Sequence, residues 1–205
     1  KIFPLLAASL LLLFASKTKF KKITILYTNT TNGYIEDCRC PSNPNGGVHR
    51  RATFLKNYKT RHLLFDTGDL FPAHGDRLKS LAMIQAYQRL GYDAIAAGDQ
   101  EFSSGIGFMI TNLPTLPFIN NNMAICSARE CFRVSKSFMI KEINGVKAGV
   151  IGIIAPQSLN FYPPQVRTNL KIDDPFEILP RIVAELEEKT DLIVLLSHSG
   201  LEIDK

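Results

Sequence analysis

Residues Gly91–Phe102 read GYDAIAAGDQEF, and this stretch contains the pattern that decides the fold. The apolar run Ala94–Ala97 is typical of a short buried strand. It stops at the polar turn Gly98–Glu101, which carries two acids and an amide. The stretch therefore predicts a strand that ends at a polar rim.

Four further apolar runs end in the same way, in polar turns that mostly contain glycine. The predicted strands are 23–27, 62–65, 116–119 and 192–196, and the turns that follow them are 28–33, 66–69, 120–122 and 197–200. Between these runs, helical patterns predict helices over 48–58, 76–90, 103–111 and 174–189. Strands that alternate with helices predict an α/β fold.

Two local signals refine this α/β prediction. Asn144-Gly145 lies between the apolar runs 138–143 and 146–154, which predicts a β-hairpin and hence an antiparallel part in the sheets. Pro180 lies inside the last predicted helix and predicts a kink or a break there.

The polar turns supply a candidate metal site. Because the carboxyl ends of strands line one edge of an open α/β sheet, where ligands bind, Asp69, Asp99 and His198 should converge. Taken singly, an Asp after a Gly is more often a turn former or a helix cap. Taken together, two hard oxygen donors and an imidazole suit a divalent Zn, Mn or Fe ion. We expect one or two ions at this edge.

The charge of the chain is concentrated at its start. The net charge is +5, from 24 basic and 19 acidic residues, and the first 22 residues hold five lysines and no acid. The remaining residues therefore balance, with 19 charges of each sign. No stripe of Lys and Arg interleaved with aromatic residues occurs, so we expect no nucleic-acid partner.

The same N-terminal stretch holds an uncharged apolar run, Ile2–Ala15, of about 14 residues. A membrane span needs roughly 20 residues and a signal-peptide core about 7–15. We expect residues 1–22 to be a signal peptide or an N-terminal membrane anchor, the only membrane contact, and the protein to be exported, periplasmic or anchored on the outer side. The chain opens without Met and stops soon after a strand, so we expect a fragment.

Four cysteines suit an oxidising compartment. Cys126 and Cys131 are candidates for a local disulfide. Cys38 and Cys40 are one residue apart, and a disulfide that tight is strained and easily reduced. Metal binding, redox chemistry and structural disulfides with Cys126 and Cys131 remain open for this pair.

The ordered set of motifs resembles the UshA-like 5′-nucleotidases, a group of calcineurin-like metallophosphoesterases. The matching segments are 23–33, 46–51, 64–69, 91–102, 116–123, 146–154 and 191–200. The likeness therefore runs in order over most of residues 23–200. The Cys-x-Cys-Pro motif at 38–41 further resembles the subgroup of UshA-like (seleno)proteins.

The resemblance implies a metallophosphoesterase-type α/β sandwich with mixed sheets over 23–205, incomplete at its C-terminus. It also implies metal-dependent hydrolysis of a small phosphorylated substrate such as a nucleotide. Asp69 matches the metal-bridging Asp of the family, and His198 matches a metal-binding His. Asp99 stands in place of a metal-binding Asn and can still bind an ion.

Three departures indicate an altered site. Thr30 and Asn32 stand where the family has a ligand Asp and a ligand His, and Gln100 stands at its catalytic His. Cys38 and Cys40 lie in the same first loop and are further candidate ligands, for zinc. The alternative function is a non-hydrolytic exported protein that uses Cys38 and Cys40 for thiol redox chemistry or metal binding. A third alternative is a chain that folds without activity.

Overall fold

The computed structural model of the chain describes residues 21–42, 45–127, 129–133 and 135–205. The predicted signal peptide or anchor, apart from its last two residues, lies outside these ranges. Within them, no helix combines the length and the apolar character needed to cross a membrane.

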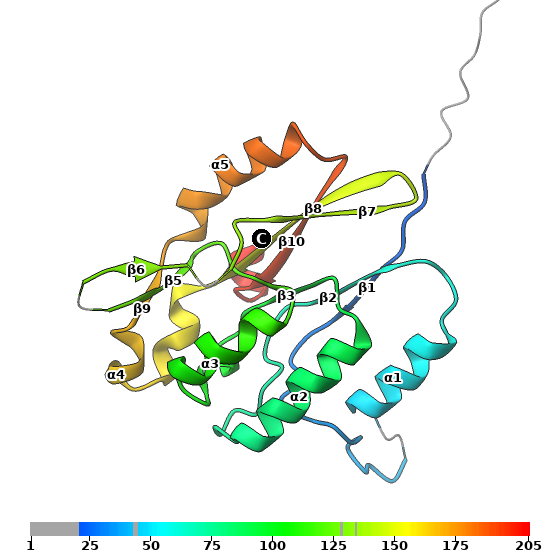
Figure 1. Cartoon of the computed structure of the whole chain (residues 1–205), viewed down its shortest axis with the longest axis horizontal. Coiled ribbons are helices and arrows are strands. Elements are labelled where there is room, and N and C mark those ends of the chain that lie inside the picture. Colours follow the sequence, from blue (N-terminus) through cyan, green and yellow to red (C-terminus); the bar gives the residue numbers. More distant parts are fainter. Residues whose placement is uncertain (1–20, 43–44, 128, 134) are drawn as a thin grey trace, which may run out of the picture.

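The first sheet is parallel and carries three helices on one face (Figure 1). Its strand order is β1 (Ile25–Thr28), β2 (Leu63–Asp66), β3 (Ala94–Ala96) and β4 (Phe118–Ile119). The helices are α1 (Val48–Asn57), α2 (Arg77–Leu90) and α3 (Ile106–Asn112). Because side chains alternate along a strand, Leu64 and Ile95 pack under the helices while Phe65 and Ala96 face the opposite way.

The second sheet packs against that opposite face. It has the order β10 (Leu192–His198), β8 (Val146–Ile154) and β7 (Met139–Ile143), with β10 parallel and β7 antiparallel to β8. Ala148, Val150 and Leu196 meet the first sheet in a shared apolar layer. On the far side, Ile151 and Ile153 bury α5 (Pro175–Glu187). The layers are therefore helices, sheet, sheet and helix.

A small third sheet extends from the sandwich. It joins β6 (Cys131–Phe132), β5 (Met123–Cys126) and β9 (Leu170–Ile172) in antiparallel pairs. The remaining elements are short: α4 (Pro164–Arg167), α6 (Leu201–Asp204) and the 3₁₀ turns η1 (Gln100–Phe102), η2 (Leu113–Thr115) and η3 (Pro156–Phe161). None of the third sheet was expected, because β6 has only two residues and β9 has three, and β9 pairs with β5 over a long sequence distance.

The turn after β4 joins the two main sheets. Asn122 Nδ2 donates to the carbonyl of Ile154 at 2.7 Å, and the amide of Ile154 donates to Asn122 Oδ1 at 3.0 Å. Asn121 Oδ1 accepts from the amide of Gly152 at 2.9 Å. A Cβ on Gly152 would overlap the carbonyl of Ile119, so the close approach of β8 to β4 requires glycine there. This polar turn is therefore a structural joint between the sheets.

The predicted α/β sandwich with mixed sheets is confirmed. The Asn144-Gly145 hairpin is present, with φ of 52° and 69° at the two turn residues. Two expectations need correction. The polar turns border two packed sheets, since β10 pairs with β8 and not with β1–β4. Of the kink or break expected at Pro180, the break does not occur: helix α5 continues through Pro180, because Pro180 is exposed and the carbonyl it deprives of a partner can face water.

Candidate metal centre

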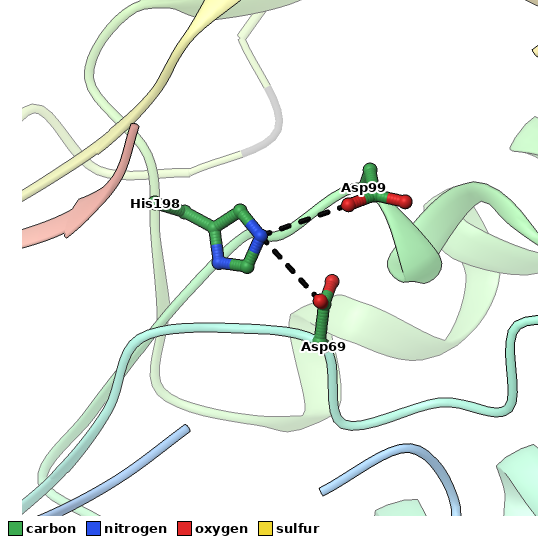
Figure 2. Close-up of side chains that lie close together, drawn as sticks. All are labelled: Asp69, Asp99 and His198. Carbon is green, nitrogen blue, oxygen red and sulfur yellow. Dashed lines mark ion pairs between the residues drawn. The ribbon is translucent and has the colours of Figure 1, made fainter. Parts of the chain in front are cut away.

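Asp69, Asp99 and His198 lie together at the carboxyl ends of β2, β3 and β10 (Figure 2). His198 Nε2 is 3.5 Å from Asp69 Oδ2 and 3.7 Å from Asp99 Oδ1. One ligand atom from each residue lies within 4.8 Å of the other two. The three side chains come from both main sheets, so the packing of the sheets creates the cluster.

The Asp69 turn is held by close backbone packing. Gly68 has φ of 106°, which favours glycine, and Asp69 itself has φ of 60°. A Cβ on Gly68 would lie 2.7 Å from the carbonyl carbon of Ala97. A Cβ on Gly98 would overlap Asp69 Oδ1 and lie 2.8 Å from His198 Cε1. Gly98 therefore leaves the space in which Asp69 and His198 meet.

Glu101 fixes the two acid-bearing turns relative to each other. Its side chain is fully buried, and its carboxylate accepts from the amides of Asp69 at 3.0 Å, Leu70 at 2.8 Å and Gly98 at 2.6 Å. Burial, together with the charge of Asp69, raises the pKa of Glu101 to about 7, although the three amide donors act to lower it. Glu101 is a positioning residue.

The ring of His198 is oriented by a backbone carbonyl. Its Nδ1 lies 2.8 Å from the carbonyl oxygen of Thr67, so Nδ1 carries a proton and donates it. Nε2 then points at Asp69 and Asp99. Burial alone lowers the pKa of His198, but the interactions with Asp99 and Asp69 outweigh it and raise the pKa to about 9. The carboxylates therefore favour a positive charge at this position.

The three donors fit a divalent cation. Oxygen and nitrogen ligands lie about 2.0–2.2 Å from zinc, which puts two ligands of a tetrahedral site about 3.4 Å apart. The contacts of 3.5 and 3.7 Å from His198 Nε2 are close to that spacing. The hydrogen bond from His198 to a carbonyl is also the outer contact that metal-binding histidines usually make.

Gln100 lies against Asp69. Its backbone amide donates to Asp69 Oδ1 at 3.1 Å and its Nε2 to Asp69 Oδ2 at 3.4 Å. Its Oε1 is buried with no hydrogen-bond partner among the described residues. Gln100 thus orients Asp69 and keeps one acceptor for a water or a ligand.

The turn after β1 has residues at positive φ but carries no acidic or imidazole side chain. Thr30 has φ of 47° and Asn32 of 53°. The amides of Thr30, Asn32 and Gly33 donate to the carbonyls of Gly68, Asp69 and Leu70 at 2.8–3.0 Å. The turn therefore runs beside the Asp69 turn.

A buried polar network anchors this first turn from behind. Thr31 Oγ1 accepts from Arg51 Nη2 at 2.9 Å and is 2.7 Å from Tyr87 Oη. Arg51 Nη1 also donates to Tyr87 and Tyr92, and Tyr87 donates to buried Asp66 at 2.8 Å. Burial raises the pKa of Asp66 to about 6.

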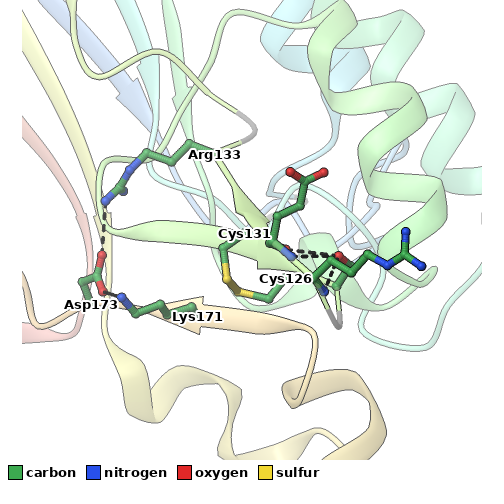
Figure 3. Close-up of a disulfide and its surroundings, with 8 residues drawn as sticks. Cys126, Cys131, Arg133, Lys171 and Asp173 are labelled. Carbon is green, nitrogen blue, oxygen red and sulfur yellow. Dashed lines mark hydrogen bonds and ion pairs between the residues drawn. A yellow bond between two sulfur atoms is a disulfide. The ribbon is translucent and has the colours of Figure 1, made fainter.

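The cysteines form two separate local pairs. Cys38 is bonded to Cys40, and Cys126 to Cys131 across the β5–β6 hairpin (Figure 3). Disulfides between the two pairs, one of the open alternatives, do not occur. The cluster of Asp69, Asp99 and His198 includes no cysteine, and Cys38 and Cys40 bind each other in this structure.

Sequence reasoning assigned no role to Glu101, Arg51 or Asp66. Glu101 follows Gly98 by three residues in a polar turn, and its burial depends on the fold of a distant segment. One signal was available for Asp66, since it directly ends an apolar run where a charge needs a partner. Tyr162 was also missed; burial raises its pKa, as do the charges of Asp99, Glu101 and Asp69.

Proteins similar to this chain in sequence and fold include several 5′-nucleotidases. The 5′-nucleotidase of Rattus norvegicus is 27% identical over 98% of this chain and 38% of its own length. The structure of a 5′-nucleotidase precursor from Thermus thermophilus superposes with a TM-score of 0.76, at 26% identity over 89% of this chain. The resemblance to UshA-like 5′-nucleotidases is confirmed.

A third comparison extends the fold to a broader group. The calcineurin-like phosphoesterase YfkN of Bacillus subtilis superposes with a TM-score of 0.69 at 23% identity, which supports the fold alone. No family model matches the chain. The chain spans 38% of the length of both 5′-nucleotidases above. Membership of the Cys-x-Cys-Pro subgroup remains a prediction.

Proposed function

We propose that this chain is the metal-binding part of a phosphoester hydrolase of the 5′-nucleotidase type, and that it holds one divalent ion through Asp69, Asp99 and His198. The observation that carries the proposal is the position of His198 Nε2, 3.5 and 3.7 Å from two carboxylates that follow other strands. The likeness to 5′-nucleotidases supports the reaction class.

The proposal of one ion rests on the first turn. Thr30 and Asn32 offer a hydroxyl and an amide where the resemblance implies a second set of ligands. Neither side chain carries a negative charge or an imidazole, so a second cation would find weak donors there. Cys38 and Cys40 are left out of the proposed metal shell because their sulfurs are bonded to each other.

A divalent ion would polarise a phosphoryl oxygen and lower the pKa of water. Asp69 and Asp99 would supply the negative charge that binds it, and the Thr67 carbonyl, by accepting from His198 Nδ1, leaves Nε2 as the ring atom that would face the ion. Gln100 Oε1 can accept a hydrogen bond from water. An amide does not transfer protons near pH 7, so we expect no general acid or base from Gln100.

The substrate class and the location follow from the relatives. We propose a small phosphorylated substrate such as a nucleotide, since the similar proteins are named 5′-nucleotidases. We further propose that residues 23–205 form one metallophosphoesterase-like domain and that residues 1–22 direct export. A precursor form named for one similar structure is consistent with export.

Hydrolysis of a chromogenic phosphate monoester in the presence of Zn²⁺, Mn²⁺ or Fe²⁺ tests the proposal. Asp69→Asn should lower kcat/KM at least about 100-fold, because outer contacts of metal sites alone are worth 10–100-fold. The matched control is Asp76→Ser, which keeps the cap of α2 and should leave the rate unchanged. A wild-type protein that binds metal but hydrolyses no faster than Asp69→Asn would contradict the proposal.

A further inference from the structure

We propose that the Cys38–Cys40 disulfide is redox-active and exchanges with a dithiol reductant, whereas Cys126–Cys131 is a structural disulfide. Cys131 is exposed as well, so the two pairs differ in backbone strain and in the contacts that hold the cysteines together, and this difference decides which disulfide is reduced more easily. This inference needs no metal ion and does not depend on the proposed hydrolase function.

The Cys38–Cys40 pair is accessible. Cys38, Arg39 and Cys40 are all exposed, in the loop between β1 and α1. The loop is held at its base, where the amide of Cys38 donates to the carbonyl of Asn45 at 3.0 Å. An attacking thiolate can therefore reach a disulfide whose position is defined.

The ring closed by this disulfide is small and holds one residue in an unfavourable backbone conformation. Only Arg39 separates the two cysteines, and Arg39 has φ of 48°, a conformation that residues with a Cβ rarely adopt. Opening the disulfide releases that constraint. Strained and exposed disulfides have the more oxidising potentials and are the labile ones.

The two sulfurs have unlike hydrogen-bond partners. The amide of Asn45 is 3.3 Å from Cys38 Sγ and can donate to a thiolate there. Cys40 Sγ lies 3.6 Å from the carbonyl of Cys38, which accepts from a neutral thiol. The nearby charges balance, since Arg39 pairs with Glu36 and Arg50 with Asp37. The hydrogen bonds thus favour Cys38 as the thiolate and Cys40 as the thiol.

The exchange then has a defined direction. A thiolate of the reductant attacks Cys40 Sγ, the Cys38–Cys40 bond breaks, and Cys38 leaves as a thiolate that accepts from Asn45. The second thiol of the reductant then attacks the reductant sulfur that is bonded to Cys40. The mixed disulfide breaks, Cys40 is released as a thiol, and the reductant is left as a disulfide. Two electrons pass to the cysteine pair, the reductant becomes a disulfide, and its two protons end on solvent or on the cysteine sulfurs.

Cys126 and Cys131 stay aligned by other contacts. They lie opposite each other in the β5–β6 register (Figure 3). The amide of Ser127 donates to the carbonyl of Glu130 at 2.8 Å. The amide of Cys126 donates to Asn169 at 2.9 Å. If this disulfide is reduced, the hairpin keeps the two thiols adjacent, which favours its re-formation.

Equilibration of the purified protein in glutathione buffers of increasing reducing ratio tests the inference. Acid quenching, alkylation and peptide mass spectrometry report each pair separately. Cys38–Cys40 should be half-reduced at a ratio at least about tenfold less reducing than Cys126–Cys131 requires. Half-reduction of both pairs at one ratio, or of Cys126–Cys131 first, would overturn the inference.

Three variants make the test specific. Cys126→Ser/Cys131→Ser should leave the midpoint of Cys38–Cys40 unchanged, and a shift would overturn the separation of the pairs. Arg39→Gly removes the backbone cost and should move the midpoint to more reducing buffers; no shift, or the opposite one, contradicts the assigned strain. In Cys38→Ser/Cys40→Ser, the more easily reduced pair should be absent.

Brief treatment of the wild type with glutathione tests the direction of the exchange. The glutathione adduct should form on Cys40, and adducts mainly on Cys38 would overturn the proposed direction.

Discussion

Two turns that lie side by side at the same rim differ in what they present. The turn after β2 carries Asp69, whose carboxylate is aimed at His198. The turn after β1 carries Thr30 and Asn32, and its amides donate to the carbonyls of the Asp69 turn. Both turns hold residues other than glycine at positive φ. The comparison teaches that two turns with residues at positive φ can lie side by side and still differ in whether their side chains supply charge to the rim.

The largest expected effect comes from closing the space behind the Asp69 turn. Gly98→Ala places a Cβ against Asp69 Oδ1 and His198 Cε1, so the three ligands can no longer converge. We expect a loss of about 3 kcal/mol in the free energy of unfolding, from overpacking, and no measurable metal binding. Denaturant unfolding and metal titration measure both quantities.

The matched control for Gly98→Ala is Gly107→Ala. A Cβ on Gly107 meets nothing within 4 Å, and the residue lies in α3. This change should stabilise the protein by about 0.5–1 kcal/mol. An equal loss of stability in the two variants would contradict the claim that close packing around Gly98 causes the destabilisation.

The second largest expected effect comes from Glu101, which holds the Asp69 turn but, among the described residues, makes no hydrogen bond to the first turn. Glu101→Gln replaces one carboxylate oxygen with an amide NH2 group, which cannot accept a hydrogen bond. One oxygen accepts from the amide of Leu70 and the other from the amides of Asp69 and Gly98, so one or two of these three bonds are lost. We expect a loss of about 1–3 kcal/mol in stability and metal binding about 10–100-fold weaker. An unchanged metal affinity would remove Glu101 from the positioning role.

The most informative but smaller effect is a gain at the first turn. Thr30→Asp with Asn32→His places ligand side chains on a backbone at positive φ, which both introduced residue types tolerate. Metal titration should then give two ions per chain in place of one. Asn32→Ala alone serves as the control and should keep one ion. A double variant that still binds one ion would mean that the first turn has lost its geometry as well.

Much of the fold was predictable because local signals were strong. The helices α1 and α2 and the Asn144-Gly145 hairpin all follow from short sequence patterns. The separation into two sheets was not predictable in this way, because the pairing of β10 with β8 joins segments about 40 residues apart. Convergence of the three site residues was expected at one sheet edge, and the packing of two sheets brings it about.

The supporting groups of the site were harder to foresee. Glu101 and Arg51 look like surface residues in sequence, and only the fold surrounds them with backbone amides or tyrosine hydroxyls. The roles of Thr31 and Tyr87 depend on contacts between the first turn and α2, which no local pattern encodes. Ligand types can therefore be found from sequence, whereas the groups that position them require coordinates.

Metal titration by calorimetry with Zn²⁺ or Mn²⁺ tests the central claim most directly, with Asp69→Asn and His198→Ala beside the wild type. We predict one ion per chain for the wild type and at least about 100-fold weaker binding for each variant. Two ions in the wild type, or unchanged affinity in both variants, would contradict a single site built from Asp69, Asp99 and His198.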